Sequence, residues 1–259
     1  MSVDIILELI INNWHIILLF FIVAILYSSV GFGGGSSYLA ILALTSIAFT
    51  QIRATALLCN IIVVFGNVFI FSKNKIIDWK KIIPLVSLSV PFAFLGGYIK
   101  ISQHFFFILL GLTLLFTSIS MWLSKKISSS NISKSKPNYF KNAGLGGFIG
   151  FISGMVGIGG GIFLAPLLHL TNWDTPKKIA ATASLFILVN SIAGLIGQYQ
   201  NPDFIIDWNL TTILLFTVFI GGQIGNRISS SYFTPIQLKK ATAILIAFVS
   251  LQILYNYIF

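Results

Sequence analysis

The sequence predicts an all-α polytopic membrane protein made of two inverted-topology repeats, each a glycine-broken re-entrant hairpin followed by three transmembrane helices. Three observations carry this prediction: an apolar composition, a glycine motif that occurs twice, and the distribution of the basic residues. The 259 residues are 56% hydrophobic and only 8% charged, with a mean hydropathy of +0.95. Soluble domains carry about 25% charged residues, so the chain belongs in a membrane. Long apolar runs favour helices over the short alternating strands of a barrel.

Eight apolar stretches follow one another along the chain. They are residues 14–49, 54–71, 82–99, 105–123, 143–170, 179–199, 210–228 and 238–258. Six of them are about 20 residues long, which at 1.5 Å per residue matches one crossing of a hydrocarbon core about 30 Å thick. The first and the fifth are longer than one crossing needs, and each contains a run of glycines.

The two glycine runs are copies of one motif. Gly31–Gly35 reads G-F-G-G-G, and Gly157–Gly161 reads G-I-G-G-G. Each glycine weakens a helix by about 1 kcal/mol relative to alanine, and glycine also adopts left-handed backbone, so both runs predict a break in a helix. Glycines also allow close helix packing in membranes. Two copies at the turns of two inferred hairpins favour the functional break over this purely structural role.

The repetition extends beyond the glycines. Ala54-Thr55-Ala56 matches Ala181-Thr182-Ala183, Asp78-Trp79 matches Asp207-Trp208, and Gly96-Gly97 matches Gly221-Gly222, at offsets of 125 to 129 residues. A sustained offset in constant order indicates an internal duplication. We therefore expect a first transmembrane repeat over residues 1–123, a polar cytoplasmic linker over 124–141, and a second transmembrane repeat over 142–259.

The basic residues select between two topologies. If every stretch crossed once, the 16 Lys and Arg residues would divide seven to nine, with no bias. If each glycine-broken stretch returns to the side on which it began, the split is 14 to 2, and only Arg53 and Lys100 lie on the poorer side. Cytoplasmic loops are enriched in Lys and Arg, so the second topology is favoured. It places both termini outside and the repeats in opposite orientations, and it explains the net charge of +10 without a nucleic-acid partner.

A broken membrane helix needs a partner for its exposed backbone, in protein or beside a water-filled cavity. The helix that restarts after each glycine run presents free N–H groups and the positive end of its dipole, which suit an anion. Ser36 and Ser37 add hydroxyl donors. Asn60 and Asn67 share one helix face, and Asn190 lies in the matching stretch of the other half; such residues either serve the site or only bond between helices. The predicted binding residues are Gly31, Gly33, Gly34, Gly35, Ser36, Ser37, Asn60, Gly157, Gly159, Gly160, Gly161 and Asn190.

Other chemistry is poorly provided for. All six acidic residues lie at chain ends or in loops, so no membrane carboxylate is available for a cation carrier or a proton relay. We expect no catalytic residues, no cofactor and no metal, because no Ser-His-Asp or His-Glu set occurs and Cys59 is the single cysteine. Arg53 either attracts an anion or extends its side chain to lipid headgroups.

The segments G-F-G-G-G-S-S and G-I-G-G-G-I-F-L-A-P-L-L, half a chain apart, resemble the sulfite exporter TauE/SafE family. The resemblance implies a multi-pass permease of the bacterial inner membrane for small sulfur-containing anions. It also adds Pro166, which follows the second glycine run, to the site residues. The corresponding residue in the first copy is Ala40, so the two half-sites are expected to differ.

We therefore expect a secondary transporter that moves sulfite, thiosulfate or an organosulfonate by alternating access and holds it at the paired glycine breaks. The anion and membrane lipid are the expected partners. An anion channel on the same scaffold is the alternative, and a membrane-embedded assembly factor or enzyme is less favoured. The anion, the direction of transport, the coupling ion and the oligomeric state stay open.

Overall fold

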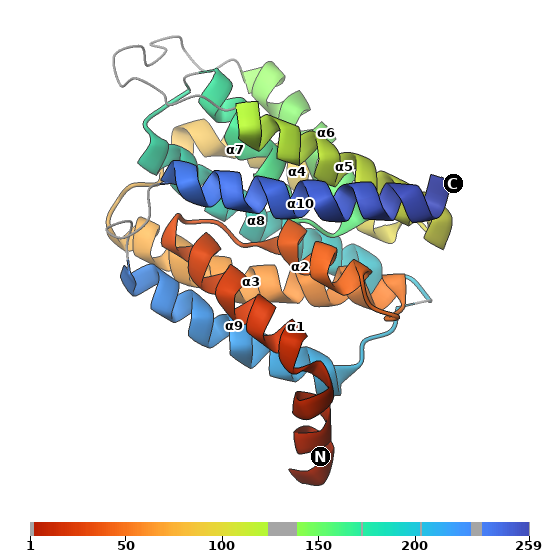
Figure 1. The fold of residues 1–259 in the computed structure, drawn as a ribbon. Coiled ribbons are helices and arrows are strands. Elements are labelled where there is room, and N and C mark those ends of the chain that lie inside the picture. The colour runs from red at the N-terminus through yellow and green to blue at the C-terminus, as the bar shows by residue number, and fades with distance from the viewer. Residues whose placement is uncertain (1–2, 124–138, 172, 203, 229–234, 259) are drawn as a thin grey trace.

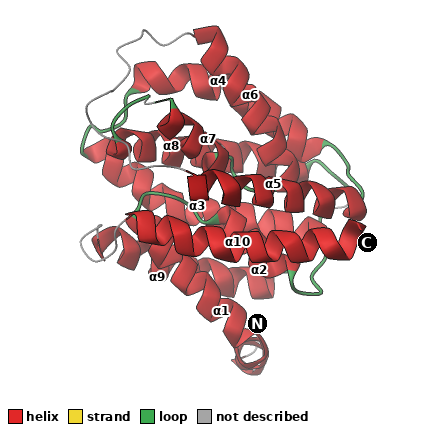
Figure 2. Ribbon diagram, turned by 45° about the horizontal axis from the view of Figure 1, so that its top comes forward, coloured by secondary structure: helices red, strands yellow, loops and turns green. Residues whose placement is uncertain are grey.

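The computed structural model describes residues 3–123, 139–171, 173–202, 204–228 and 235–258. These residues form ten α-helices and no strand (Figure 1; Figure 2), which confirms the all-α prediction. The helices are α1 (Val3–Ser29), α2 (Gly35–Ala43), α3 (Phe49–Lys73), α4 (Trp79–Tyr98), α5 (Gln103–Leu123), α6 (Tyr139–Val156), α7 (Gly161–Leu170), α8 (Pro176–Tyr199), α9 (Trp208–Ile228) and α10 (Pro235–Ile258). Within the described residues, six helices are long and apolar enough to cross a membrane.

The helices follow the predicted stretches. The six single stretches became α3, α4, α5, α8, α9 and α10, and the two longer ones are divided at the glycine runs into α1 with α2 and α6 with α7. α1 begins earlier than its apolar stretch and departs from helical geometry at Asn13. α6 begins at Tyr139, inside the predicted linker; residues 124–138 of that linker lie outside the described residues.

The first glycine break turns the chain back. Ser28, near the end of α1, bonds Asn226 near the end of α9 through side chains 2.7 Å apart. A Cβ added to Gly31 would lie 2.8 Å from the ring of Phe71, near the end of α3. α1 and α3 therefore end on the same side of the bundle, and the break with α2 carries the chain back between them, through the middle of the molecule in Figure 1.

The second break does the same from the other side. A Cβ added to Gly157 would lie 3.2 Å from the Cβ of Arg53, near the start of α3. A Cβ added to Gly194, near the end of α8, would lie 3.4 Å from the Cα of Gly154 on α6. α6 and α8 thus end on the side where α3 begins, and α7 returns the chain between them.

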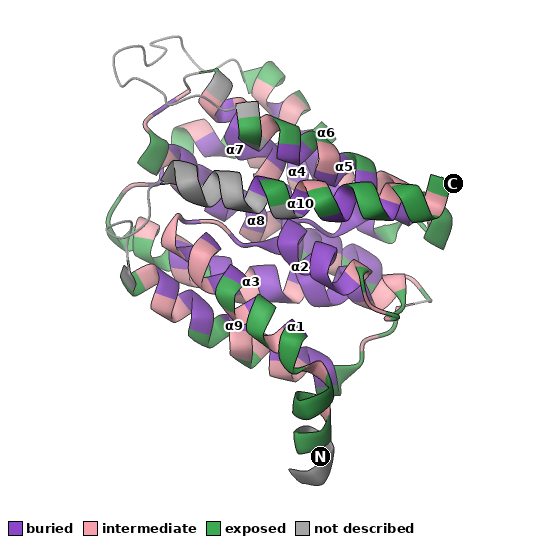
Figure 3. Ribbon diagram, viewed as in Figure 1, coloured by how far each residue is buried: buried purple, intermediate pink, exposed green. Residues whose placement is uncertain are grey.

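The returning helices form the centre of the bundle. The residues of α2 from Gly35 to Leu42 are all buried, and Figure 3 shows α2 in the colour of buried residues beside α1 and α10, which carry exposed residues. Large apolar side chains such as Phe65, Phe116 and Phe216 are exposed, which suits contact with lipid. The short helices are therefore held by protein and not by lipid.

One side of the bundle carries a well-defined ion pair. The Nζ of Lys81, at the start of α4, lies 2.6 Å from a carboxylate oxygen of Asp174, just before α8. The connection from α3 to α4 and the connection from α7 to α8 therefore share one side. We call it the basic side, because Lys80, Lys81 and Lys177 lie at these connections.

Candidate functional site

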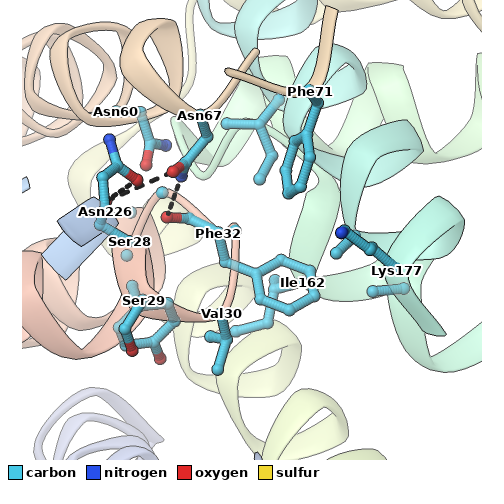
Figure 4. Close-up of a pocket in the computed structure, with 18 of the residues that line it drawn as sticks. Ser28, Ser29, Val30, Phe32, Asn60, Asn67, Phe71, Ile162, Lys177 and Asn226 are labelled. Carbon is cyan, nitrogen blue, oxygen red and sulfur yellow. Dashed lines mark hydrogen bonds between the residues drawn. The ribbon is translucent and has the colours of Figure 1, made fainter. Parts of the chain in front are cut away.

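A cavity of about 550 Å³ lies between the first glycine break and helices α3, α7 and α8. Figure 4 shows 18 of the residues that line it. Its inner wall contains the whole of Gly31–Gly35 together with Ser36 and Asn60. Its lining continues to Asn74 and Lys177, so the cavity opens toward the basic side.

The first glycine break presents free backbone donors to this cavity. Gly34 is the N-cap of α2, with φ of 89° and no capping side chain, and Gly31 has φ of 83°. These left-handed conformations favour glycine. In the described part of the chain, the N–H groups of Gly33, Gly34, Gly35 and Ser36 have no hydrogen-bond partner. The start of a helix with four free donors is an anion-binding arrangement.

The second break has a similar backbone but does not face the same space. Gly157, Gly159 and Gly160 have φ between 80° and 87°, whereas Gly33, the counterpart of Gly159, does not adopt positive φ. Only Ile158 of this break lines the cavity. The two breaks are thus related in conformation and different in exposure.

Asn60 joins the two breaks. Its Nδ2 donates a hydrogen bond of 2.8 Å to the carbonyl oxygen of Ile158, and its Oδ1 is buried without a partner. A Cβ added to Gly35 would overlap this amide and lie 2.7 Å from the Ile158 carbonyl oxygen. The close approach of the two breaks therefore requires glycine at position 35.

The corresponding position in the second half carries no amide. At the repeat offset of 127, Asn60 corresponds to Ile187, which packs against Gly161 as Asn60 packs against Gly35. A polar neighbour of Gly159 in the second break is Ser191, whose buried Oγ has no partner among the described residues. The half-sites therefore differ, as the contrast between Pro166 and Ala40 suggested.

A polar network holds the first break in place. Asn67 donates from Nδ2 to the carbonyl oxygen of Phe32 at 3.3 Å, and the Oγ of Ser28 lies 3.3 Å from Oδ1 of Asn67 and 2.7 Å from Oδ1 of Asn226. Figure 4 shows Ser28, Asn67 and Asn226 grouped beside Phe32. They fix the backbone that turns from α1 toward α2.

The structure brings together about half of the predicted binding residues. Those that line the cavity are Gly31, Gly33, Gly34, Gly35, Ser36, Asn60 and Pro166. Those that do not are Ser37, Gly157, Gly159, Gly160, Gly161 and Asn190. The hydroxyl of Ser37 lies 3.0 Å from that of Tyr27, and Nδ2 of Asn190 bonds the Phe186 carbonyl oxygen of its own helix at 2.8 Å. For all of these residues the binding role stays a prediction.

Several lining residues were not in the predicted set. Ser28 and Lys177 line the cavity from the end of α1 and the start of α8, and the sequence carried no signal that would select them. Asn67 could have been selected, because it lies seven residues after Asn60 on the same helix face. Among the described residues, no group of three or more His, Cys, Asp or Glu could hold a metal ion.

Comparison with known proteins points to one group of membrane proteins. Residues 16–253 match the family model described as Sulfite exporter TauE/SafE. The chain is 34% identical to the probable membrane transporter protein y4hK of Sinorhizobium fredii, over 91% of this chain and 96% of that protein. It is 30% identical to the probable membrane transporter protein MJ0441 of Methanocaldococcus jannaschii, over 70% of each chain. No solved structure matches the chain.

Proposed function

This chain is a member of the sulfite exporter TauE/SafE family, and we propose that it carries a small sulfur-containing anion across the membrane by alternating access. That it is a membrane transporter follows from the family and from its relatives. Sulfite, thiosulfate and organosulfonates are the candidate anions. The observation that carries the proposal is the group of four unpaired N–H groups, Gly33 to Ser36, at the inner end of the cavity.

These donors match the chemistry of a sulfur oxyanion. Such an anion spreads its charge over several oxygens, and each oxygen accepts hydrogen bonds from N–H or O–H groups. The buried Oγ of Ser36 has no partner in the described chain and adds a hydroxyl donor. Lys177 at the mouth attracts anions, and the described lining contains no carboxylate to repel them.

We infer that the two halves are inverted repeats that exchange access between the two sides of the membrane. α1 and α3 end on the basic side, whereas α6 and α8 end on the opposite side, which supports opposite orientations. The packing pair α1–α9 also has its counterpart in α6–α4 when the halves are exchanged. In this arrangement the basic side is the cytoplasm, the membrane is the bacterial inner membrane, and both termini are outside.

The cavity favours a carrier over a channel. It reaches the first break and Ile158 of the second from the basic side, and Gly157 packs against Arg53 on the other side. A carrier must expose its site to one side at a time. Uptake into proteoliposomes should therefore saturate and be accelerated by unlabelled anion inside, whereas a non-saturating flux without this acceleration would favour a channel.

The decisive test changes one glycine at the proposed site. We expect Gly35→Ala to reduce transport of labelled sulfite at least about tenfold, because the added methyl group pushes Asn60 and the second break away from the donors. Gly144→Ala is the matched control, since a Cβ there meets nothing within 4 Å. Equal transport by wild type and Gly35→Ala would show that the anion does not bind at the first break. Absence of transport by the wild type for sulfite, thiosulfate and sulfonates would overturn the function.

A further inference from the structure

Three buried polar side chains in the region of the second glycine break do not line the open cavity. Arg53, Ser153 and Gln198 are 3%, 0% and 4% exposed. Nε of Arg53, Oγ of Ser153 and Nε2 of Gln198 are buried without a hydrogen-bond partner in the described part of the chain. All three groups can donate hydrogen bonds. Arg53 and Ser153 lie against the second break, and Gln198 lies one helical turn beyond Gly194, which faces Gly154 of α6. Buried donors are normally paired, so these three unpaired donors call for a ligand.

Arg53 is a buried cation with few polar contacts. Its Nη2 reaches only the Gly154 carbonyl oxygen, at 3.3 Å, and its Cζ lies 6.0 Å from the centre of the Phe106 ring. No carboxylate of the described residues pairs with it. The side chain does not extend to lipid headgroups, because it is buried. A buried cation without a counter-charge is costly, and an anion that binds during part of a cycle removes that cost.

The internal duplication shows what this position corresponds to. At the offset of 127, Arg53 corresponds to Ala180, which lines the open cavity. A Cβ added to Gly31 would lie 3.3 Å from the Cβ of Ala180, and one added to Gly157 would lie 3.2 Å from the Cβ of Arg53. The same contact therefore exists at both breaks. The contact of Gly31 with Ala180 borders the open cavity, whereas the contact of Gly157 with Arg53 lies where the guanidinium of Arg53 is buried.

The other two donors also occupy wall positions. Tyr27 and Phe71 line the open cavity, and at offsets of 126 and 127 they correspond to Ser153 and Gln198. The wall of the open cavity thus has a counterpart in the second half. That counterpart carries two hydrogen-bond donors and one cation.

Arg53 and Gln198 lie at the same end of the bundle. A Cβ added to Gly194 on α8 would lie 3.6 Å from Cδ1 of Leu57 on α3. Arg53 precedes Leu57 by one helical turn and Gln198 follows Gly194 by one turn; because α3 and α8 run antiparallel, both lie beyond this contact, away from the basic side. Ser153 lies beside the second break itself, since its Oγ would lie 3.2 Å from a Cβ added to Gly160.

We propose that Arg53, Ser153 and Gln198 form a second anion-binding subsite with the N–H groups of Gly159, Gly160 and Gly161, which have no hydrogen-bond partner among the described residues. This subsite is reached from the side opposite the basic side and is closed in the present conformation. It receives the same small oxyanion when the carrier faces the other way. Arg53 supplies its positive charge, as Lys177 at the cavity mouth does for the site at the first break. The inference rests on the proposed function, whose anion it shares.

Single cysteines test the accessibility of the subsite. Cys59 is fully buried, so a Cys59→Ala background is suitable. In proteoliposomes, Ala180→Cys should react with a membrane-impermeant maleimide from the basic side only. Gln198→Cys should react from the opposite side only, and sulfate or methanesulfonate, neither of which reacts with maleimides, should change its rate of labelling.

Substitution of Arg53 tests the chemistry. In the Gln198→Cys background, Arg53→Gln should raise at least about tenfold the anion concentration that gives half of the maximal change in labelling rate. Arg53→Lys should bring this concentration most of the way back to the value measured with Arg53. A purely structural role would lower the melting temperature in both variants without shifting that concentration. Two results would overturn the subsite alone. One is that the wild type transports the anion but Gln198→Cys is never labelled from the opposite side. The other is that Arg53→Gln leaves the anion concentration for half-maximal effect unchanged. Failure of the wild type to transport any tested anion would overturn the proposed function itself.

Discussion

At the scale of single residues, Asn60 is the side chain that connects the two glycine breaks. Its amide donates to the Ile158 carbonyl oxygen, and it is 1% exposed. Removal of the amide leaves that carbonyl buried without a donor, which costs about 1–3 kcal/mol. We expect Asn60→Ala to lower the melting temperature by several degrees and to weaken the thermal stabilisation that sulfite gives to the wild type.

The control for this variant is Asn209→Ala, because Asn209 is exposed at the start of α9. Both changes remove the same group, so only Asn60→Ala should affect the melting temperature. If the two variants melt alike and respond alike to sulfite, the bridge between the breaks has no part in stability or in binding.

Some features of the site could be predicted from the sequence, and others could not. The backbone donors at Gly33–Ser36 could be predicted, because a glycine run within an apolar stretch must break the helix there. The choice between Asn190 and Ser191 could not. These neighbours differ by about 100° around α8, and the rotation of a helix about its axis is set by packing against other helices. Ser191 faces the second break, whereas Asn190 bonds its own helix.

At the scale of elements, the pair α4 and α6 shows how glycine builds the scaffold around the site. Cβ atoms added to Gly146, Gly150 or Gly154 would overlap backbone carbonyl groups of α4. Close approach of this kind depends on small residues and drives helix association in membranes. We expect Gly150→Val to push the helices apart and to cost about 1–3 kcal/mol, measured as a lower melting temperature in detergent.

Gly144→Val provides the comparison, since Gly144 lies on the same helix and a Cβ there meets nothing within 4 Å. Both variants carry the same propensity change within α6, so the difference between them isolates the contact with α4. A melting temperature of Gly150→Val as high as that of Gly144→Val would contradict the packing argument.

The ion pair on the basic side joins the start of α4 to the approach to α8. Burial tends to raise the pKa of Asp174, but hydrogen bonds from Lys81 and from the Thr175 N–H, with the nearby charge of Lys178, hold it below its ordinary value of 3.8. Because the folded pKa is lower than the unfolded one, the stabilisation is present above about pH 4 and is lost as the pH falls through the folded value.

We expect Asp174→Asn to lower the melting temperature at pH 7, where the pair contributes about 1–2 kcal/mol. The wild type should lose this advantage below about pH 4, so the two melting curves should converge there. Asp78→Asn serves as the control, because its carboxylate has no ion pair among the described residues. A constant difference between wild type and Asp174→Asn across this pH range would exclude the ion pair as its cause.

At the scale of the whole molecule, the order of the helices could be predicted from hydropathy together with the two glycine runs, because a membrane span and a helix break each leave a local record in the sequence. The return of each broken stretch was predicted from the charge count, which the ends of α1 and α3 on one side support. The one-sided opening of the cavity could not be predicted. It depends on the relative position of the two halves. It also depends on contacts between segments about 100 residues apart, such as that of Gly157 with Arg53.

Topology is the prediction on which the inverted arrangement of the halves depends. Lys80 and Lys100 are both exposed and precede and follow α4, so they lie at opposite ends of one crossing helix. In a Cys59→Ala background, Lys80→Cys should react with an impermeant maleimide only in inside-out vesicles, and Lys100→Cys only in intact spheroplasts, because the basic side is predicted to be cytoplasmic. Disruption of the membrane with detergent should make both fully reactive, which controls for local reactivity. Labelling of Lys80→Cys from outside would reverse the whole molecule and with it the side to which the open cavity faces.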